Sequence, residues 1–289
     1  MESKVSKLET LTNFFRAIFW ILLIAIILYQ WISDRWLNVS SHEKKRGAVI
    51  EAIQEERGSR VITLIHREET LSVFGVPIHR YIDIDDAEAI LRAIRLTPPD
   101  KPIDLIVHTP GGLVLAASQI AYAIQRHKGK VTVFIPHYAM SGGTLIALAA
   151  DEIVMDPNAV LGPVDPQIGE FPAASIVKVV ETKKPDKVED KTMILADISI
   201  KAINQVSLMV FQLLEKKMSN EKAKKLAALI TTGQFTHDFP ITVDRARFVG
   251  LDISTDMPEK IYTLMDFYPQ TGLGRPSVNY VPMQKGQEK

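Results

Sequence analysis

The sequence predicts an α/β domain with a largely parallel sheet, preceded by an N-terminal transmembrane helix. Two observations support this prediction. Short apolar, β-branched runs alternate with segments of helical spacing through much of the chain, and one uninterrupted apolar stretch lies near its start. The length of 289 residues suffices for one large domain or two small ones with a buried core.

The apolar stretch covers residues 17–32 and contains no charged residue. Roughly 20 residues at about 1.5 Å each cross the hydrocarbon layer, and flanking apolar residues extend the stretch. A signal peptide would need a small-residue cleavage site, which does not follow, and a buried core helix would usually carry a polar stripe. We therefore predict an uncleaved single-pass anchor at 1–37. Basic residues on both sides leave the side of the membrane open.

The remaining elements follow in chain order. Residues 38–60 are highly charged and predict a juxtamembrane helix or linker. The next segments predict strands at 61–66, 78–84, 105–108, 131–136 and 153–155, and helices at 85–96, 113–126 and 141–150. Beyond these, the sequence predicts a mobile polar loop at 181–191, helices at 192–218 and 220–229, closing segments at 248–251 and 261–267, and a flexible tail at 270–289. The main domain is therefore expected at 61–269.

Composition excludes several functions. Lys and Arg number 34 and Asp and Glu number 34, so the chain lacks the basic excess that nucleic-acid binding needs, and no nucleic-acid partner is expected. Cysteine is absent, which excludes disulfides, thiolate zinc sites, iron–sulfur clusters and a cysteine nucleophile. No metal or organic cofactor is implied.

Two glycine pairs each follow a predicted strand and precede a predicted helix. The first is HTPGG at 108–112, and the second is AMSGG at 139–143. Glycine lets the backbone turn sharply and present its N–H groups, which here lie at the positive end of a helix dipole. Two such turns, side by side at the carboxyl edge of a parallel sheet, would form an oxyanion hole.

Ser141 lies inside the second turn, at the start of the following helix. It is either a nucleophile beside the converging amides or only the N-cap of the helix, which is the commonest use of serine at such a position. The motif is not GxSxG, so an α/β-hydrolase elbow is not supported. Neither glycine pair matches a nucleotide-binding pattern.

A serine nucleophile needs a base. His108 and His137 lie at strand ends beside the glycine turns and are candidates, with structural roles as the alternative. Lys201 stands alone as a charged residue between Asp197 and Glu215. Such a lysine either extends to solvent or is buried, and burial would favour the neutral form that accepts a proton.

The two motifs, HTPGG and AMSGGTLIALAADEIVMDPNAVLGPVDPQIG, resemble the signal peptide peptidase A and Clp protease clan. The chain is more narrowly similar to the membrane-associated serine dehydrogenase proteinase family. ILADISIKAINQV at 194–206 and GQFTHDFPITVDRARFVGLDI at 233–253 fit as well, so the resemblance covers about 60–255. It implies a Clp/crotonase-like fold of repeated ββα units.

The resemblance implies a serine peptidase with Ser141 as nucleophile and the amides of Gly112 and Gly142 as oxyanion hole. Clp proteases carry a histidine base about two dozen residues after the serine, but the segment 161–166 contains none. The resemblance therefore implies a Ser–Lys dyad, as in the signal peptide peptidase branch of the clan. Lys201 is the best match for the base, and Lys191 is the alternative.

Asp165 and His237 also lie in recognisable segments. Asp165 is flanked by Pro163 and Pro166, so it could equally be a turn residue as a residue near the site. Neither Asp165 nor His237 is assigned a catalytic role. The resemblance further implies a homo-oligomer, and leaves open whether the dyad forms within or between subunits. Expected partners are peptide substrates, hydrophobic or membrane-derived, and the lipid bilayer.

Two other functions compete with the peptidase. A crotonase-type acyl-CoA hydratase or isomerase would also use paired backbone amides, but normally has catalytic carboxylates and no serine in the second turn. A non-catalytic membrane scaffold would keep the fold without the reaction. Labelling by a serine-reactive fluorophosphonate separates the peptidase from both.

Overall fold

The structure is a computed structural model that describes residues 2–66 and 81–268, with only some side chains of the first helix. The chain divides into two units, residues 1–50 and 51–289. The helix α1 (Glu2–Arg57) is continuous, so the predicted juxtamembrane segment 38–60 is helical through most of its length. The predicted tail at 270–289 lies outside the described residues.

The predicted anchor lies within α1. Several apolar side chains between residues 14 and 29 are more than half exposed, including Phe19, Trp20 and Ile21. The apolar part of α1 with described side chains, Arg16–Ile26, is shorter than a full span. Over the described side chains, the helix that is long and apolar enough to cross a membrane is instead α6 (Asp190–Leu214), by length and composition. An N-terminal anchor therefore stays a prediction.

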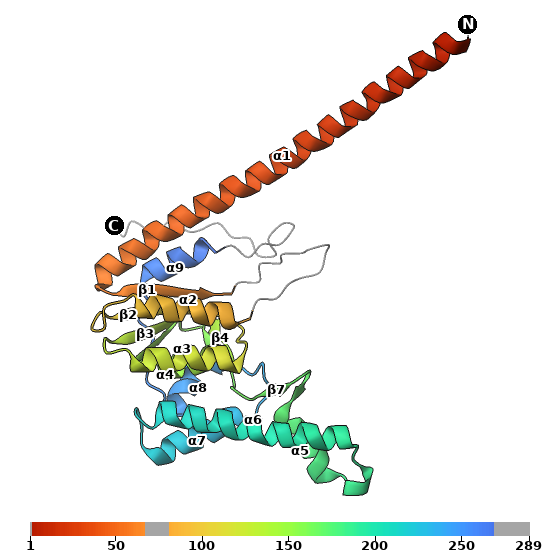
Figure 1. The fold of residues 1–289 in the computed structure, drawn as a ribbon. Helices are drawn as coiled ribbons and strands as arrows, with labels where there is room; N and C mark the ends of the chain where they lie inside the picture. Colours follow the sequence, from red (N-terminus) through yellow and green to blue (C-terminus); the bar gives the residue numbers. More distant parts are fainter. Residues whose placement is uncertain (1, 67–80, 269–289) are drawn as a thin grey trace, which may run out of the picture. The chain divides into compact units, whose positions relative to one another are not determined.

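The second unit is built on a five-stranded, fully parallel sheet in the order β1-β2-β3-β5-β10 (Figure 1). Its strands are β1 (Arg60–Ile65), β2 (Ile103–His108), β3 (Val131–Ile135), β5 (Glu152–Met155) and β10 (Ile253–Ser254). All residues of β2 and β3 are buried, as expected for central parallel strands covered on both faces. The predicted parallel α/β sheet is confirmed.

Two helices lie side by side along this sheet, α2 (Ile84–Arg95) and α3 (Val114–Arg126) (Figure 1). The helix α2 begins at a capping box. The Asp83 side chain accepts a hydrogen bond from the Asp86 amide, and the Asp86 side chain accepts one from the Asp83 amide. The predicted strand at 78–84 is reduced, within the described residues, to a single β-bridge between Ile82 and Gly112. Residues 78–80 lie outside the described part of the chain.

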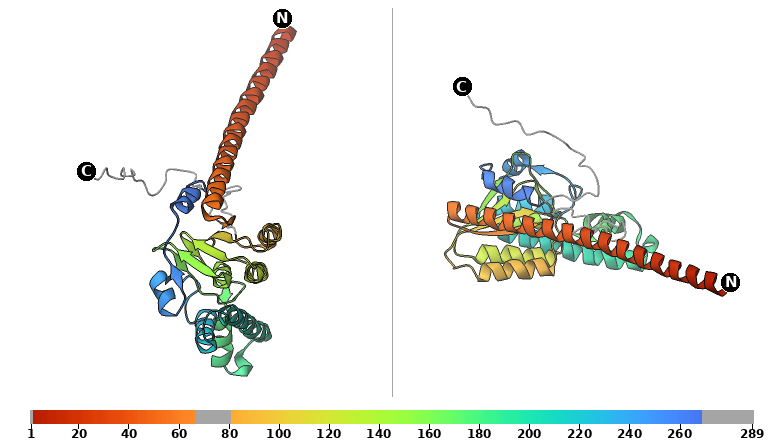
Figure 2. Two further views of the ribbon diagram at one scale, coloured as in Figure 1. Left: turned by 90° about the vertical axis from the view of Figure 1, so that its left-hand side faces the viewer. Right: turned by 90° about the horizontal axis from the view of Figure 1, so that it is seen from above.

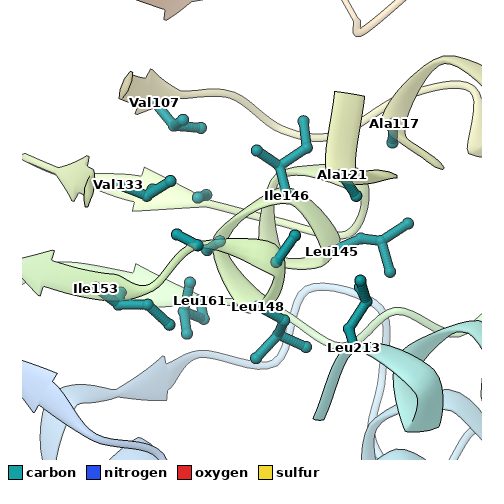
Figure 3. Packing of buried hydrophobic residues seen from close by; sticks show 14 of the residues in the cluster. Val107, Ala117, Ala121, Val133, Leu145, Ile146, Leu148, Ile153, Leu161 and Leu213 are labelled. Carbon is teal, nitrogen blue, oxygen red and sulfur yellow. The ribbon is translucent and has the colours of Figure 1, made fainter. Parts of the chain in front are cut away.

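The helix α4 (Gly142–Ala149) is buried at every position and forms the centre of the core. Figure 3 shows its Leu145, Ile146 and Leu148 packed among side chains of the sheet and of α3 and α6. Small residues such as Ala117 and Ala121 on α3 allow α4 to approach closely. The turn that carries Ser141 therefore lies at the start of a rigidly held helix.

Short strands complete the unit around α4. In a three-stranded sheet, β6 (Val160–Leu161) pairs parallel to β4 (Tyr138–Ala139) and antiparallel to β9 (Ile241–Thr242). A separate hairpin joins β7 (Gln167–Ile168) and β8 (Phe171–Pro172). The segment that follows β6 is held against α4, because Gly162 is hydrogen-bonded to Thr144.

A further helical layer lies beyond α4 (Figures 1 and 2). It contains α5 (Ala173–Thr182), α6 and α7 (Asn220–Thr231). Towards the carboxyl end follow α8 (Val243–Phe248) and α9 (Glu259–Asp266). The helix α6 packs on α4, α5 and α7 and contributes Val206, Val210 and Leu213 to the core, so it is an integral part of this unit.

The predicted loop at 181–191 is wrong in most of its length. The helix α5 reaches Thr182, a 3-10 turn occupies Pro185–Lys187, and α6 begins at Asp190. Several β-branched residues lower the helix propensity of α5, which concealed it in the sequence. It forms because Ala173 and Ile176 are buried as it packs on α6, an example of tertiary packing overriding propensity.

Candidate active site

Ser141 occupies a strained turn between β4 and α4. Its φ of 48° and ψ of −114° make it the one non-glycine residue with positive φ in the described part of the chain. Such backbone geometry costs on the order of 1–3 kcal/mol and is concentrated at functional sites. Although Ser141 stands at the N-cap position, its side chain makes no capping hydrogen bond. The hydroxyl of Ser141 therefore does not cap α4.

The two glycine turns meet at this serine. A Cβ added to Gly111 would lie 2.7 Å from Ser141 Cβ and 3.1 Å from the Gly142 nitrogen. A Cβ on Gly142 would lie 3.5 Å from the Gly112 nitrogen. Gly111 also has a φ of 106°, which a side chain would strain. The turns can touch only because both lack side chains at these positions.

The amides of Gly112 and Gly142, which are expected to form the oxyanion hole, do not take part in the hydrogen bonds that hold the two turns. Ile82 N–H donates to Gly111 O over 2.7 Å, and Leu113 N–H donates to Ile82 O over 2.8 Å, so this pairing bypasses the Gly112 amide. The Gly142 amide is the first of α4, and the first N–H groups of a helix have no intrahelical acceptor. Both amides therefore remain available to a ligand oxygen.

Thr144 holds the serine turn to a second segment. Its hydroxyl lies 2.7 Å from Ala139 O and 2.8 Å from Gly162 O, and it accepts from the Gly162 amide over 3.0 Å. Val164 N–H in turn donates to Ile230 O at 2.7 Å. These bonds fix the segment after β6 close to Ser141.

A pocket of about 520 Å³ opens in front of Ser141. Its polar and titratable lining includes Ser141, Asp165, Gln167, His237 and Asp238. Its apolar lining comprises Leu113, Val114, Met140, Leu145, Val164 and Val206. A mostly apolar pocket with a few convergent polar groups is the usual form of a ligand site.

A histidine–aspartate pair lies in this pocket. His237 Nδ1 is 2.8 Å from Asp165 Oδ1, and Gln167 Nε2 donates to Asp165 Oδ2 over 2.7 Å. The Asp165 side chain is 3% exposed, whereas that of His237 is 35% exposed. The buried carboxyl group is therefore held by two partners, and the ring that it orients stays accessible.

The predicted lysines lie elsewhere in the single chain. Lys201 on α6 is 65% exposed and forms an ion pair with Asp197 over 2.5 Å, so the alternative that it is buried in an apolar helix is wrong. Residues Ile198 and Ile200 beside it are themselves exposed, so the apolar environment predicted from the sequence does not form there. Lys191 is also exposed. Neither lysine lines the pocket of Ser141.

Two further basic groups are accounted for by structural roles. His108 is buried, and its ring contacts those of His137 and Tyr138 rather than the pocket. Burial lowers the pKa of Lys217 to about 8, but its ammonium group donates to the carbonyl oxygens of Leu148 and Ala150. These carbonyls lie at the end of α4, roughly 12 Å from its start for a helix of this length.

A second histidine–aspartate pair, His66 and Asp86, supports the first glycine turn through Thr109. His66 Nε2 is 3.1 Å from Asp86 Oδ2, and His66 Nδ1 is 2.9 Å from Thr109 Oγ1. Thr109 Oγ1 accepts from the Gly111 amide over 3.2 Å. This chain of contacts links the capping box of α2 to the turn that approaches Ser141. Over the described residues, no cluster of three or more acidic or histidine side chains could hold a metal.

The sequence thus predicts the serine and the two turns but assigns no catalytic role to Asp165 or His237. Nothing in the sequence indicates that two residues 72 positions apart meet. One signal was present. Asp165 is a charged residue between Pro163 and Pro166 in an otherwise apolar segment, and a carboxylate that becomes buried needs partners.

The fold and the site together define an α/β protein that presents a strained serine beside two glycine turns. The family model for ClpP-like SDH-type serine proteinases matches residues 5–289, and the chain belongs to this family. The mixed α/β fold is accordingly ClpP-like.

The sequence identity between this chain and its relatives varies widely. The chain is 52% identical over 283 residues to the uncharacterized protein MJ0137 of Methanocaldococcus jannaschii, covering 98% of this chain and 97% of that protein. It is 56% identical over 239 residues to MJ1495 of the same organism, covering 83% and 82%. The solved structure of ClpP1 from Listeria monocytogenes matches with a TM-score of 0.45 and 18% identity, covering 71% of this chain and 97% of that chain.

Proposed function

We propose that this protein is a serine peptidase in which Ser141 is the nucleophile and the amides of Gly112 and Gly142 stabilise the oxyanion. The observation that carries the proposal is the backbone of Ser141, which is strained and leaves its hydroxyl unused for capping at the edge of a pocket. Membership of the ClpP-like SDH-type serine proteinase family supports it. A strained turn exposes the nucleophile to substrate while both amides face the developing charge.

The proposed substrates are hydrophobic or membrane-derived peptides. Leu113 and Val114 line the pocket and are 55% and 47% exposed, although large apolar side chains at that edge would normally be covered. Met140, Leu145 and Val164 continue the apolar lining. An extended peptide with apolar side chains fits such a surface, because burying them contributes roughly 25 cal/mol per Å².

The proposed location is a membrane, with the segment 17–32 of α1 as a single-pass anchor. Its support is the uncharged sequence, the continuous helix and the exposure of its described apolar side chains. An anchor would hold the peptidase near membrane-derived substrates. We further propose a homo-oligomer, for which exposed apolar residues on α6 such as Ile194 and Leu208 offer a contact surface.

The Ser–Lys dyad implied by the resemblance would have to form across subunits or after rearrangement. Within one chain Lys201 is paired with Asp197 at the surface, and Lys191 is exposed. A neighbouring subunit could carry either lysine to Ser141 and exclude water around it, which would favour the neutral amine.

The experiment that tests the peptidase compares the full chain in detergent with its Ser141→Ala variant. The readouts are labelling by fluorophosphonate–rhodamine and cleavage of a fluorescent casein. The wild-type protein should be labelled and active, and Ser141→Ala should lose both because the attacking oxygen is gone. Retention of both by the variant would reject Ser141. A wild-type protein that is neither labelled nor active would favour the scaffold alternative.

A further inference from the structure

We propose that His237 is the general base of Ser141 and that Asp165 positions it. This inference rests on the proposed peptidase function and replaces a lysine base with a histidine reached from a distant part of the chain. The observation behind it is that Ser141, Asp165 and His237 line one pocket, with Asp165 and His237 hydrogen-bonded to each other. In chain order the three functional groups run serine, aspartate, histidine.

The fold brings the pair together through strand pairing. In the antiparallel pair of β6 and β9, Leu161 faces Ile241. Asp165 lies four residues after Leu161, and His237 lies four residues before Ile241. This pairing brings the segment after β6 alongside the segment before β9. There a turn closed by the Phe239 N–H to Thr236 O hydrogen bond presents His237 to Asp165, with a contact of 2.8 Å.

Both ends of this pairing are anchored independently. Thr144 on α4 binds Gly162, and Val164 binds Ile230 at the end of α7. On the other side, the loop that carries His237 is braced by Phe235 and Phe239, whose rings stack with centroids 4.2 Å apart. A base must be held to within a fraction of an ångström to act, and this bracing restricts its movement.

The hydrogen bonds assign the tautomer of His237. A carboxylate can only accept, so the 2.8 Å contact makes Nδ1 the protonated nitrogen of the neutral ring. Gln167 Nε2 lies at a longer 3.3 Å from the same nitrogen and already donates to Asp165 Oδ2. The lone pair then resides on Nε2, which makes no hydrogen bond to any of the described residues. This nitrogen belongs to the ring that lines the pocket.

This tautomer is the one that the reaction needs. Nε2 takes the hydroxyl proton of Ser141 while Oγ bonds to the peptide carbonyl carbon, and the oxyanion is held by the two glycine amides. The peptide C–N bond then breaks as the proton passes from Nε2 to the amine nitrogen, which leaves. Water next gives a proton to Nε2 and its oxygen to the acyl carbon, and the C–Oγ bond breaks as the proton returns to Ser141. Asp165 stabilises the imidazolium in both halves of the cycle.

The test measures the rate of labelling by fluorophosphonate–rhodamine in the full chain, separated into the maximal rate constant and the concentration for half-maximal rate. His237→Ala should lower the rate constant by about 10²- to 10⁴-fold, the usual contribution of a general base. Asp165→Asn should lower the same constant with little effect on half-maximal concentration, because it changes the orientation of the ring rather than probe binding. Lys201→Ala tests the lysine that the resemblance implies: a rate constant that falls as far as in His237→Ala would favour the lysine as base instead.

Two comparisons separate catalysis from folding. His127→Ala removes a histidine outside the pocket whose ring Nε2 lies 2.7 Å from Lys101 O, and it should label normally. Free imidazole added to His237→Ala should restore part of the labelling rate, because it can occupy the space of the missing ring. A variant that is slow only because it is misfolded would not respond to imidazole.

The possible outcomes are distinct. A fast His237→Ala together with a slow Lys201→Ala or Lys191→Ala would overturn the histidine base while leaving the peptidase intact. A slow His237→Ala that imidazole does not rescue would also overturn it, since the histidine would then act only through structure. If the wild-type protein is not labelled at all, both the function and this inference fail.

Discussion

Two histidine–aspartate pairs lie near the glycine turns, and they differ in how many ring nitrogens have hydrogen-bond partners. In the His66 pair both ring nitrogens have partners, Asp86 and Thr109, and the side chain is 7% exposed. In the His237 pair the contacts converge on one nitrogen, and the ring is 35% exposed toward a pocket. The same pair of side chains therefore supports a turn in one place and, as we propose, transfers a proton in the other.

The comparison teaches that accessibility and a vacant ring nitrogen distinguish a reactive histidine from a structural one. A ring with both nitrogens bonded within the protein offers neither nitrogen to a substrate. A ring held at one nitrogen by a buried carboxylate is oriented and still able to accept. Mutations in the two pairs should consequently separate stability from catalysis.

The largest effect outside the serine and its base is expected at the turn that the His66 pair supports. Gly111→Ala would place a Cβ 2.7 Å from Ser141 Cβ at a φ of 106°, which displaces the turn and its amide. Labelling should slow by about 10²- to 10³-fold, as on loss of an oxyanion-hole donor.

Gly250→Ala is the matched control for Gly111→Ala. Gly250 has a φ of 97° but no atom within 4 Å of an added Cβ. It should lose about 1–2 kcal/mol of stability from backbone strain alone and keep its labelling rate. Equal rates for both variants would show that crowding at Ser141 does not matter.

His66→Ala should reverse the pattern expected for His237→Ala. Loss of a buried ring with two hydrogen-bonding nitrogens should lower the free energy of unfolding by about 2–4 kcal/mol. The labelling rate of the folded protein should fall by much less than the ~10²-fold expected when a general base is removed. Thermal denaturation and labelling of the same preparation check both. A stable but unreactive His66→Ala would contradict the division of roles.

Asp86→Asn should have the smallest effect. Its Oδ2 accepts from the Asp83 amide and contacts His66 Nε2, so the change weakens the capping box and one histidine contact. A loss of about 1 kcal/mol is expected, measured by denaturant unfolding. Asp165→Asn, the matching change in the other pair, should instead slow labelling. If the two aspartates exchange these phenotypes, the comparison fails.

Much of the fold follows from local pattern. The strands at 105–108, 131–136 and 153–155 are confirmed because central parallel strands are continuous apolar runs, which the sequence displays directly. The helices α2, α3, α4 and α7 are confirmed near their expected limits. The helix α5 was missed because its stability comes from packing on α6 rather than from its own residues.

Parts of the site could be predicted for the same local reason. The two glycine pairs and Ser141 each stand at a strand-to-helix junction, and such junctions are visible within a few residues of sequence. Lys201 was misplaced because an apolar helix does not reveal which of its faces is covered. In the folded chain the exposed face carries Lys201 together with Ile198 and Ile200.

The sequence by itself determined that there is a serine between a strand and a helix, two glycine turns and an α/β sheet to carry them, because these depend on neighbours along the chain. Only the tertiary structure decided that Gly111 abuts Ser141 and that Asp165 faces His237. The second contact depends on the pairing of β6 with β9, two short strands about 80 residues apart, and on the turn before β9 that carries His237. Pairing between distant strands is set by the packing of the whole domain, which no local pattern records.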